Sequence, residues 1–335
     1  MEAQKVRINL YIMDRCNAVL ASCDICNGEM IPCWNVREAL APCGGGWKYV
    51  CCRSCGLVRL HAEGSESTWR QFACEGDYYG DGFSKFAGAI QTLREFSAWR
   101  RAREINRLFS KPGRVLDIGC GEGLFLKWMK GMGWRVDGCE IGEQAVKRAE
   151  QCLGQRIHAG EFKNMSHSDH SWDVVMLWHV LEHVSNPVEL LKYIGSVITT
   201  NGLLVVAVPN ASSWQARLFG SHWFHLDPPR HRYSFGFDHL TRMARQSGWK
   251  VMESHHFSLE YNPFGWAQSF LNSLGWRRDA MYETLKRRSK PVEGAWALRV
   301  VAWLLLGPSI IPAILEAAVG KGGAVAVYLR KSGAQ

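Results

Sequence analysis

The chain lacks the features that would direct it across a membrane. Glu2 follows Met1, and no apolar segment with a cleavage site comes after it, so we expect no secretory signal. An apolar stretch from Val300 to Leu315 is interrupted by Pro308 and Pro312. It is shorter than the about twenty apolar residues that a spanning helix requires. The sequence therefore predicts a cytoplasmic protein.

Cysteine and positive charge, in contrast, are plentiful. The 335 residues are 47% apolar, which is enough for one large core and a small second domain. The net charge of +9 is compatible with nucleic acid, an anionic membrane surface or phosphorylated substrates, and it selects none of them. Twelve cysteines without a secretory signal indicate a reducing compartment, where cysteines paired by spacing hold a metal rather than form disulfides.

A glycine-rich bend is the most informative motif. Residues 114–118 are typical of a buried strand, and residues 124–129 have the apolar periodicity of a helix. Gly119, Gly121 and Gly123 lie between them, where a sharp turn under a ligand requires positive φ and close approach of backbone amides. In the dinucleotide-binding fingerprint the third glycine would fall at Leu124, so nicotinamide binding is disfavoured.

An acid follows the glycine bend at the spacing of a ribose ligand. Residues 134–139 predict a second strand, which ends at Glu140, about twenty residues after Gly119. With Asp117 and the three glycines, this acid makes a plain strand–helix turn a poor explanation. From about Arg114 to Pro209 the chain resembles the class I S-adenosylmethionine-dependent methyltransferases.

The resemblance implies a Rossmann-like, doubly wound α/β sheet of seven strands and S-adenosylmethionine as cofactor. In that family the loop from Gly119 to Gly123 lies under the methionine part, Asp117 shapes the loop, and the acid at Glu140 binds the ribose. The acid after strand three, here Glu161, lies near the adenine amine. The expected cofactor-binding residues are Asp117, Gly119, Cys120, Gly121, Gly123, Glu140, Ile141, Glu161 and Trp178.

Two Cys-x-x-Cys pairs near the front of the chain predict a metal site. Cys23 with Cys26, and Cys52 with Cys55, provide four thiolates for a closed, tetrahedral, structural zinc site. Cys33, Cys43 and Cys51 lie between the pairs as substitutes for one ligand, and a redox motif or chance clustering are the alternatives. A zinc ribbon followed by a class I core resembles a bacterial group of zinc-ribbon methyltransferases (type 11/12/23-like), whose known members often act on sugars or small metabolites.

Candidate catalytic residues follow the fourth and fifth predicted strands. His179 and His183 are expected one helical turn apart on one face, with Glu182 beside them, just after the strand of residues 172–177. The His-x-x-Glu-His spelling also matches a zinc-protease signature, which the strand order excludes. Ubiquinone-type O-methyltransferases carry Glu-x-x-Glu-His here, which can hold a divalent metal, and this chain resembles them with His179 in place of the first acid. A general base, a weak metal site and a pocket wall all remain open for these residues.

Residues 203–210 predict the fifth strand, and the loop after it carries aromatic and basic side chains. Its Arg230, His231 and Tyr233 match a Pro-Arg-His segment typical of the zinc-ribbon group, which implies an acceptor feature. We therefore expect His179, His183, His231 and Tyr233 to be the catalytic residues.

An insertion of about seventy residues precedes the expected closing strand at residues 324–329. It contains a basic stretch and the apolar run at 300–315, which we expect to form a short helix pair. Interfacial attachment of residues 277–319 to the inner face of the membrane competes with a cap over the active site or a dimer contact. The helix at about residues 84–110 is basic on one face, with a solvated surface or an anion-facing surface as its alternatives.

These observations predict an enzyme that methylates a small molecule, a sugar or a lipid-linked glycan, with a hydroxyl as the expected acceptor group. An RNA methyltransferase that grips RNA with the ribbon and the basic helix, and a non-catalytic cofactor-binding protein, are the alternatives. We expect nucleic acid not to be the partner, because no base-amino motif is recognisable. The expected domains are a zinc ribbon (1–70), a helical linker (71–112), the methyltransferase core (113–256), a helical insertion (257–322) and a closing strand with the tail (323–335).

Overall fold

A mixed sheet forms the centre of the molecule. The computed structural model describes residues 21–36, 47–61, 88–165, 171–276, 278–285 and 295–333. In this part of the chain the central sheet has seven strands in the order β11-β12-β9-β8-β5-β6-β7. Its strands are β5 (Arg114–Ile118), β6 (Arg135–Glu140), β7 (His158–Ala159), β8 (Trp172–Trp178), β9 (Ile198–Pro209), β11 (Trp249–His255) and β12 (Ala324–Lys331).

The pairing of these strands confirms the predicted Rossmann-like fold. Strands β5 to β9 pair in parallel, whereas β12 runs antiparallel to both β9 and β11. The chain order reverses beside β5, so the carboxyl ends of β5, β6 and β8 open onto one edge, where open α/β sheets bind their ligands.

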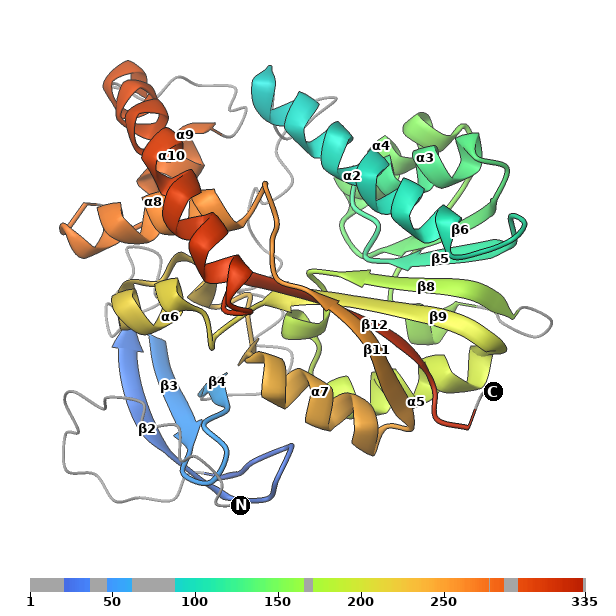
Figure 1. Cartoon of the computed structure of the whole chain (residues 1–335), viewed down its shortest axis with the longest axis horizontal. Coiled ribbons are helices and arrows are strands. Elements are labelled where there is room, and N and C mark those ends of the chain that lie inside the picture. The colour runs from blue at the N-terminus through green and yellow to red at the C-terminus, as the bar shows by residue number, and fades with distance from the viewer. Residues whose placement is uncertain are drawn as a thin grey trace.

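Helices cover both faces of this sheet (Figure 1). One face carries α2 (Ala89–Arg107), α3 (Leu124–Gly131) and α4 (Glu143–Leu153), and the other carries α5 (Pro187–Val197) and α7 (Phe237–Gln246). Val115 and Leu116 of β5 are both fully buried but belong to different core clusters. Because successive side chains of a strand point to opposite faces, a strand covered on both sides is apolar throughout. Helix α2 therefore contributes to the core, with Ala102 and Ile105 fully buried.

A smaller sheet packs against the α7 side. Its order is β1-β2-β3-β4-β10, with strands β1 (Ala21–Ser22), β2 (Glu29–Val36), β3 (Trp47–Cys52), β4 (Val58–Leu60) and β10 (Tyr233–Ser234). The last strand comes from the loop region after β9 and pairs with β4. Met30 and Leu57 of this sheet are fully buried in the same core cluster as Leu240 and Met243 of α7. The small sheet is thus built partly from the central part of the chain and shares its core.

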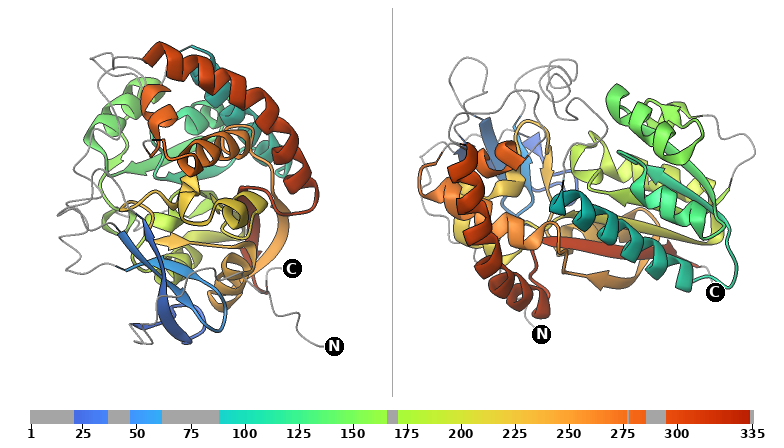
Figure 2. Two further views of the ribbon diagram at one scale, coloured as in Figure 1. Left: turned by 90° about the vertical axis from the view of Figure 1, so that its left-hand side faces the viewer. Right: turned by 90° about the horizontal axis from the view of Figure 1, so that it is seen from above.

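The insertion between β11 and β12 is helical. It contains α8 (Asn262–Ser273), α9 (Ala280–Leu285) and α10 (Ala295–Ala318), which lie together beside the central sheet (Figures 1 and 2). The expected helix pair is wrong, because α10 continues through Pro308 and Pro312. Each proline removes one backbone donor. The carbonyl that Pro308 leaves without its helical donor belongs to Leu304, a residue that is 67% exposed, so water can satisfy it. The segment Val300–Ala318 is long and apolar enough to cross a bilayer, which the sequence had not suggested.

Candidate functional site

The loops after β5 and β6 present backbone rather than side chains. Gly119, Gly121 and Gly123 all have left-handed backbone conformations, with φ of 72°, 56° and 74°. The amides of Gly119 and Cys120 both donate to the carbonyl of Cys139, at 2.8 and 3.1 Å. A Cβ on Gly119 would lie 2.5 Å from Val180 Cγ2, so glycine is also required for the close approach of the loop after β8. Cys120 itself is buried beneath the bend.

Glu140 joins the two loops. Its carboxylate accepts hydrogen bonds from the amide of Gly121 at 3.0 Å, and from the amides of Ile141 and Gly142 at 2.8 and 2.9 Å. The expected ribose ligand therefore also fixes the geometry of the glycine bend. Ile141 beside it is 62% exposed, which leaves an apolar surface open at the end of β6.

Asp117 and Arg101 place a carboxyl group and a guanidinium at the edge of this bend. Asp117 is buried and its Oδ1 has no hydrogen-bond partner among the described residues. Burial raises the pKa of Asp117 to about 8, against the opposing charge of Arg101. The guanidinium of Arg101 stacks 4.2 Å from the ring centroid of Trp178, and its Nε has no partner among the same residues.

Glu161 lies immediately after β7 and precedes the short helix Phe162–Asn164. Its side chain is about one-third exposed and pairs with Lys163 at 2.8 Å. The expected adenine contact of Glu161 stays a prediction.

The helical face expected for His179 and His183 is wrong. His179 has a φ of 56°, and only residues Leu181–His183 form a short 3-10 turn. His179 Nδ1 lies 3.2 Å from Glu182 Oε1, and its ring centroid lies 4.0 Å from that of Tyr261. In this orientation His179 Nε2 is buried, and it has no hydrogen-bond partner in the described part of the chain.

Glu182 connects the three histidines. It is fully buried, and burial alone would oppose its charge. The hydrogen bond to His179 and the charges of His179, His183 and His231 nevertheless lower the pKa of Glu182 to about 2. Glu182 therefore stays ionised, and it is the residue that brings three of the four expected catalytic residues together.

His183 and His231 are oriented by main-chain carbonyls. Their Nδ1 atoms lie 2.9 Å from the carbonyl oxygen of Arg230 and 2.7 Å from that of His225, and their ring centroids are 4.7 Å apart. Such contacts fix the tautomer that leaves Nε2 available. Each of Glu182, His183 and His231 offers one ligand atom within 4.8 Å of the others, so the three could hold a metal ion.

Tyr233 does not join this group. Its hydroxyl lies 3.1 Å from Asp24 Oδ2 and 3.3 Å from the carbonyl oxygen of Ser185. Burial and the negative charge of Asp24 raise the pKa of Tyr233 to about 12. The structure therefore places Tyr233 in the contact with the small sheet rather than facing a substrate.

Two adjoining cavities open between α2 and the ends of β8, β9 and β12. His179 is the one expected catalytic residue among their described lining residues. Both cavities are bounded by Arg100, Arg101, Trp178, Phe257 and Ser258, and one of them also by Phe96 and Leu259. The walls are largely apolar, with arginine at one side.

Comparison with known proteins identifies the family of this domain. Residues 93–254, from α2 to β11, match the model of a methyltransferase domain. These residues form a class I S-adenosylmethionine-dependent methyltransferase domain. The chain is therefore an enzyme of this class, and the resemblance noted in the sequence is confirmed.

The relatives of this methyltransferase include several named ubiquinone biosynthesis O-methyltransferase. The one from Thiobacillus denitrificans is 27% identical over 162 residues, which cover 45% of this chain and 69% of the relative. The one from Nitrosospira multiformis is 27% identical over 180 residues, covering 50% and 73%. A solved structure of a SAM-dependent methyltransferase from Archaeoglobus fulgidus is 20% identical, with a TM-score of 0.47, and covers 74% of this chain and 96% of its own.

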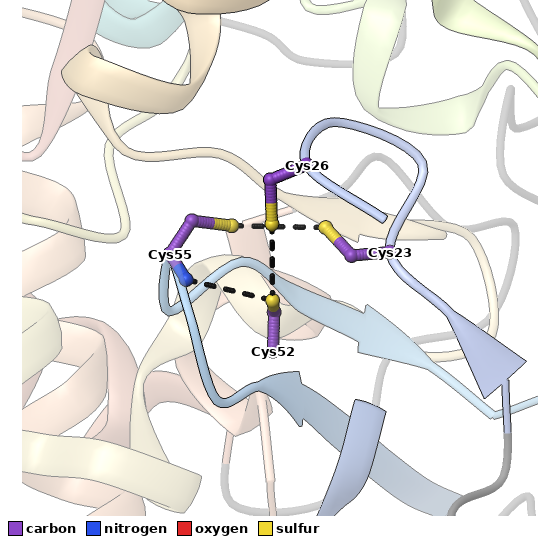
Figure 3. Close-up of side chains that lie close together, drawn as sticks. All are labelled: Cys23, Cys26, Cys52 and Cys55. Carbon is purple, nitrogen blue, oxygen red and sulfur yellow. Dashed lines mark hydrogen bonds between the residues drawn. The ribbon is translucent and has the colours of Figure 1, made fainter. Parts of the chain in front are cut away.

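The family match leaves out strands β1 to β4 of the small sheet, where the four predicted zinc ligands meet (Figure 3). Cys23 Sγ lies 3.6 Å from Cys55 Sγ, and Cys26 Sγ lies 3.4 Å from Cys52 Sγ. Cys33 and Cys51 instead hydrogen-bond to each other, and Cys43 lies outside the described residues. The alternatives for a fourth ligand are therefore not needed.

Sequence reasoning missed one residue of the site, Tyr261, which lies just before α8 and which no local pattern marked. Arg101 belongs to the helix that was expected to be basic on one face, but its stacking on Trp178 was not predicted. His225 belongs to the aromatic and basic loop after β9, and the sequence assigned it no role of its own. It is buried beside His231, where burial and neighbouring histidines lower its pKa to about 3.

Proposed function

We propose that this methyltransferase transfers the methyl group of S-adenosylmethionine to a hydroxyl of a small-molecule acceptor. The O-methyltransferase names of its relatives support the reaction. The contact that carries the proposal is the pair His179–Glu182 at the cavity wall, because it supplies a base for a hydroxyl. The sugar or lipid-linked glycan expected from the sequence stays a prediction, and the apolar walls favour an acceptor with an apolar or aromatic part.

The cofactor's amino-acid end fits two buried polar atoms at the glycine bend, while another nitrogen of Arg101 already pairs with Glu260 at 3.3 Å. A zwitterion offers an ammonium to Asp117 Oδ1 and a carboxylate to Arg101 Nε, both buried without partners among the described residues. Glu140 and the exposed Ile141 would take the ribose and the base. Bound here, the cofactor supplies a methyl group on a positively charged sulfur.

His179 would act as the general base. Its Nδ1–H donates to ionised Glu182, which orients the ring and leaves the lone pair of Nε2 toward the cavity. In the reaction the acceptor oxygen forms a bond to the methyl carbon, the carbon–sulfur bond breaks, and the hydroxyl proton passes to Nε2. Positioning contributes the rest, since the displacement is in line. The competing role is a metal site in which Glu182, His183 and His231 hold the ion. In either role, Tyr233 would position these residues.

Labelled methyl transfer tests the reaction. The purified protein with S-[methyl-³H]adenosylmethionine is given a panel of phenolic acceptors with and without a polyprenyl tail, a nucleotide sugar and tRNA. We expect alkali-stable label in the phenolic fraction and none in tRNA. Label in tRNA alone would overturn the small-molecule assignment. Loss of activity on EDTA treatment, restored by Mg²⁺ with His179 intact, would favour the metal role over the base.

We also propose a structural zinc ion at the four cysteines. A tetrahedral site with bonds of roughly 2.3 Å places its sulfurs about 3.8 Å apart, close to the separations found here. The amides of Ile25 and Cys55 lie 3.5 Å from the sulfurs of Cys23 and Cys52, as donors to bound thiolates. About one zinc per chain is expected by elemental analysis after purification without chelator. Zinc content near zero in folded protein would contradict the proposal.

The third part of the proposal is that the outer face of α10 rests on an anionic membrane surface. No charged residue occurs from position 300 to 315. Exposed apolar side chains recur along the whole helix: Val300, Trp303, Leu304, Ile310, Ile311, Ile314, Leu315 and Val319. An exposed stripe of this kind marks an interaction surface.

Two observations support the proposal that α10 rests on the membrane rather than crosses it. Glu316 is fully buried, and its carboxylate accepts from Gln215 Nε2 at 2.8 Å and from the amide of Gly323 at 2.9 Å, which ties the end of α10 to the central sheet. Four basic residues at positions 286–290 precede α10 in sequence and match an anionic leaflet. Arg278 of the same basic stretch is instead directed inward, where it donates to the carbonyls of Ser221 and Trp223.

Vesicle sedimentation tests this surface. We expect binding to vesicles containing phosphatidylglycerol, weaker binding to pure phosphatidylcholine, and loss of both in Leu304→Ser/Ile311→Ser. Leu108→Ser, an exposed apolar residue after α2, is the matched control and should bind as the wild type does. A stable dimer in solution that the double variant dissociates, without vesicle binding, would overturn the membrane proposal. The domain boundaries at residues 70, 112, 256 and 322 stay predictions.

A further inference from the structure

We propose that the first cysteine knuckle, residues 23–26, positions the acceptor wall of the active site through Asp24 and Tyr233. The acceptor wall is defined here as Glu182, His183 and His231, of which Glu182 contacts the cavity-lining His179. The inference rests on the proposed function for the meaning of that wall, but its contacts and its test do not depend on the acceptor. Asp24 stands between two metal-ligating cysteines and is not itself a ligand.

The carboxylate of Asp24 is the point at which the knuckle meets the rest of the chain. Its Oδ2 accepts from Arg59 Nη1 at 2.7 Å and from the hydroxyl of Tyr233 at 3.1 Å. Tyr233 is 4% exposed, and its hydroxyl also lies 3.3 Å from the carbonyl oxygen of Ser185. One phenol therefore connects the knuckle to the segment that begins two residues after His183.

A second connection runs through the backbone. Leu60 at the end of β4 donates its amide to the carbonyl of Arg232 at 2.8 Å, and the amide of Arg232 donates to the carbonyl of Glu182 at 2.8 Å. Tyr233 and Ser234 pair with Arg59 and Val58 as the edge of the small sheet. The sheet that carries the four cysteines is thus bonded directly to the main chain of the acceptor wall.

These connections fix the two histidines because the residues that orient them belong to the same segment. The carbonyl of Arg230 binds His183 Nδ1, and His231 is two residues before Tyr233. Because these groups are buried, each hydrogen bond that is lost would leave a polar group without a partner. This cost favours a single arrangement of the two rings. Metal at the cysteines and order at the acceptor wall should therefore be coupled.

Nitrogen NMR of ¹⁵N-histidine-labelled protein measures this coupling without a substrate. The zinc-loaded wild type, Tyr233→Phe and Asp24→Asn are compared, with the His183 and His231 signals assigned from His183→Gln and His231→Gln. Gln246→Ala is the matched control, because Gln246 Nε2 donates to the carbonyl of Ile25 at 3.1 Å and so contacts the same knuckle from α7. Zinc content and the affinity for S-adenosylhomocysteine are measured for every variant.

We expect the ring-nitrogen signals of His183 and His231 to shift in Tyr233→Phe and Asp24→Asn and to stay unchanged in Gln246→Ala. Zinc removal should shift the same signals, and by less in Tyr233→Phe, where the connection is already cut. Cofactor-product affinity should remain unchanged in all three variants. Unshifted histidine signals in both folded, zinc-loaded variants would overturn the proposal, whether or not the metal-free protein stays folded. Absence of methyl transfer to phenols would instead count only against the proposed reaction.

Discussion

The two halves of the proposed active site differ in the groups that form them, backbone on the cofactor side and side chains on the acceptor side. The cofactor side uses backbone amides of two adjacent loops, held in place by one carboxylate, Glu140. The acceptor side uses side chains from the loops after β8, β9 and β11, which meet at Glu182 and Tyr261. Backbone geometry in a glycine bend tolerates few sequences, whereas a wall of side chains can be rebuilt residue by residue. A methyltransferase built this way can keep its cofactor while its acceptor changes.

Loss of the base should separate the two halves most strongly. For His179→Ala we expect turnover to fall by about 10²- to 10⁴-fold, the usual contribution of general base catalysis. Cofactor affinity should stay within error, because His179 does not touch the glycine bend. His222→Gln, an exposed histidine, is the control. Full activity in His179→Ala would contradict the role of His179 as the general base.

Gly119 is the place where the two halves touch, so its replacement should damage both. In Gly119→Ala the new Cβ combines a left-handed backbone with a contact of 2.5 Å to Val180 Cγ2. Together these cost about 2–5 kcal/mol, so cofactor affinity should fall by about 100-fold in calorimetry. Gly220→Ala has a similar φ of 53° but open space around its Cβ, and it should leave the affinity unchanged. Equal losses in both variants would mean that strain alone is responsible.

Glu140 tests the cofactor side by itself. In Glu140→Gln the side chain can no longer accept three amides as a charged carboxylate, and roughly 1.5–3 kcal/mol should be lost. We expect affinity for S-adenosylmethionine to fall by about tenfold to 100-fold. The control Glu143→Gln changes an exposed acid paired with Lys147 at the start of α4 and should bind normally. An unchanged affinity in Glu140→Gln would contradict the assignment of this acid to the cofactor.

The smallest effect concerns stability of the acceptor side at acid pH. Burial, together with the charges of His179 and His231, lowers the pKa of His225 from 6.5 to about 3. The unfolded chain therefore binds a proton between pH 6.5 and about 3 that the folded chain does not, and unfolding free energy falls as the pH is lowered through this window. From pH 7 to pH 5 we expect a loss of about 2 kcal/mol in urea titrations, reduced in His225→Gln. The cofactor side has no histidine of this kind among its described residues, so cofactor affinity should not share the window.

The same contrast explains what could be predicted from the sequence. The strands, the glycine bend and Glu140 were predicted because strand and turn geometry depend on local spacing. The four cysteines were recognised because both knuckles carry their own local pattern. The helical face of His179 and His183 was wrong, since the left-handed bend at His179 interrupts the turn. The helix pair at 300–315 was wrong because exposed carbonyls let α10 continue through two prolines.

By itself, the amino-acid sequence determined the class of the enzyme, the glycine bend and the positions of the parallel strands along the chain, because each depends on residues that are close together in the chain. Only the tertiary structure decided which histidine lines the cavity, that Tyr233 binds a cysteine knuckle and that Arg101 stacks on Trp178. The contact of Arg101 with Trp178 joins residues 77 positions apart, and that of Tyr233 with Asp24 joins residues 209 positions apart. The bend at His179 is the one local feature among the three. Local physics gives no information on such pairs until the core brings them together.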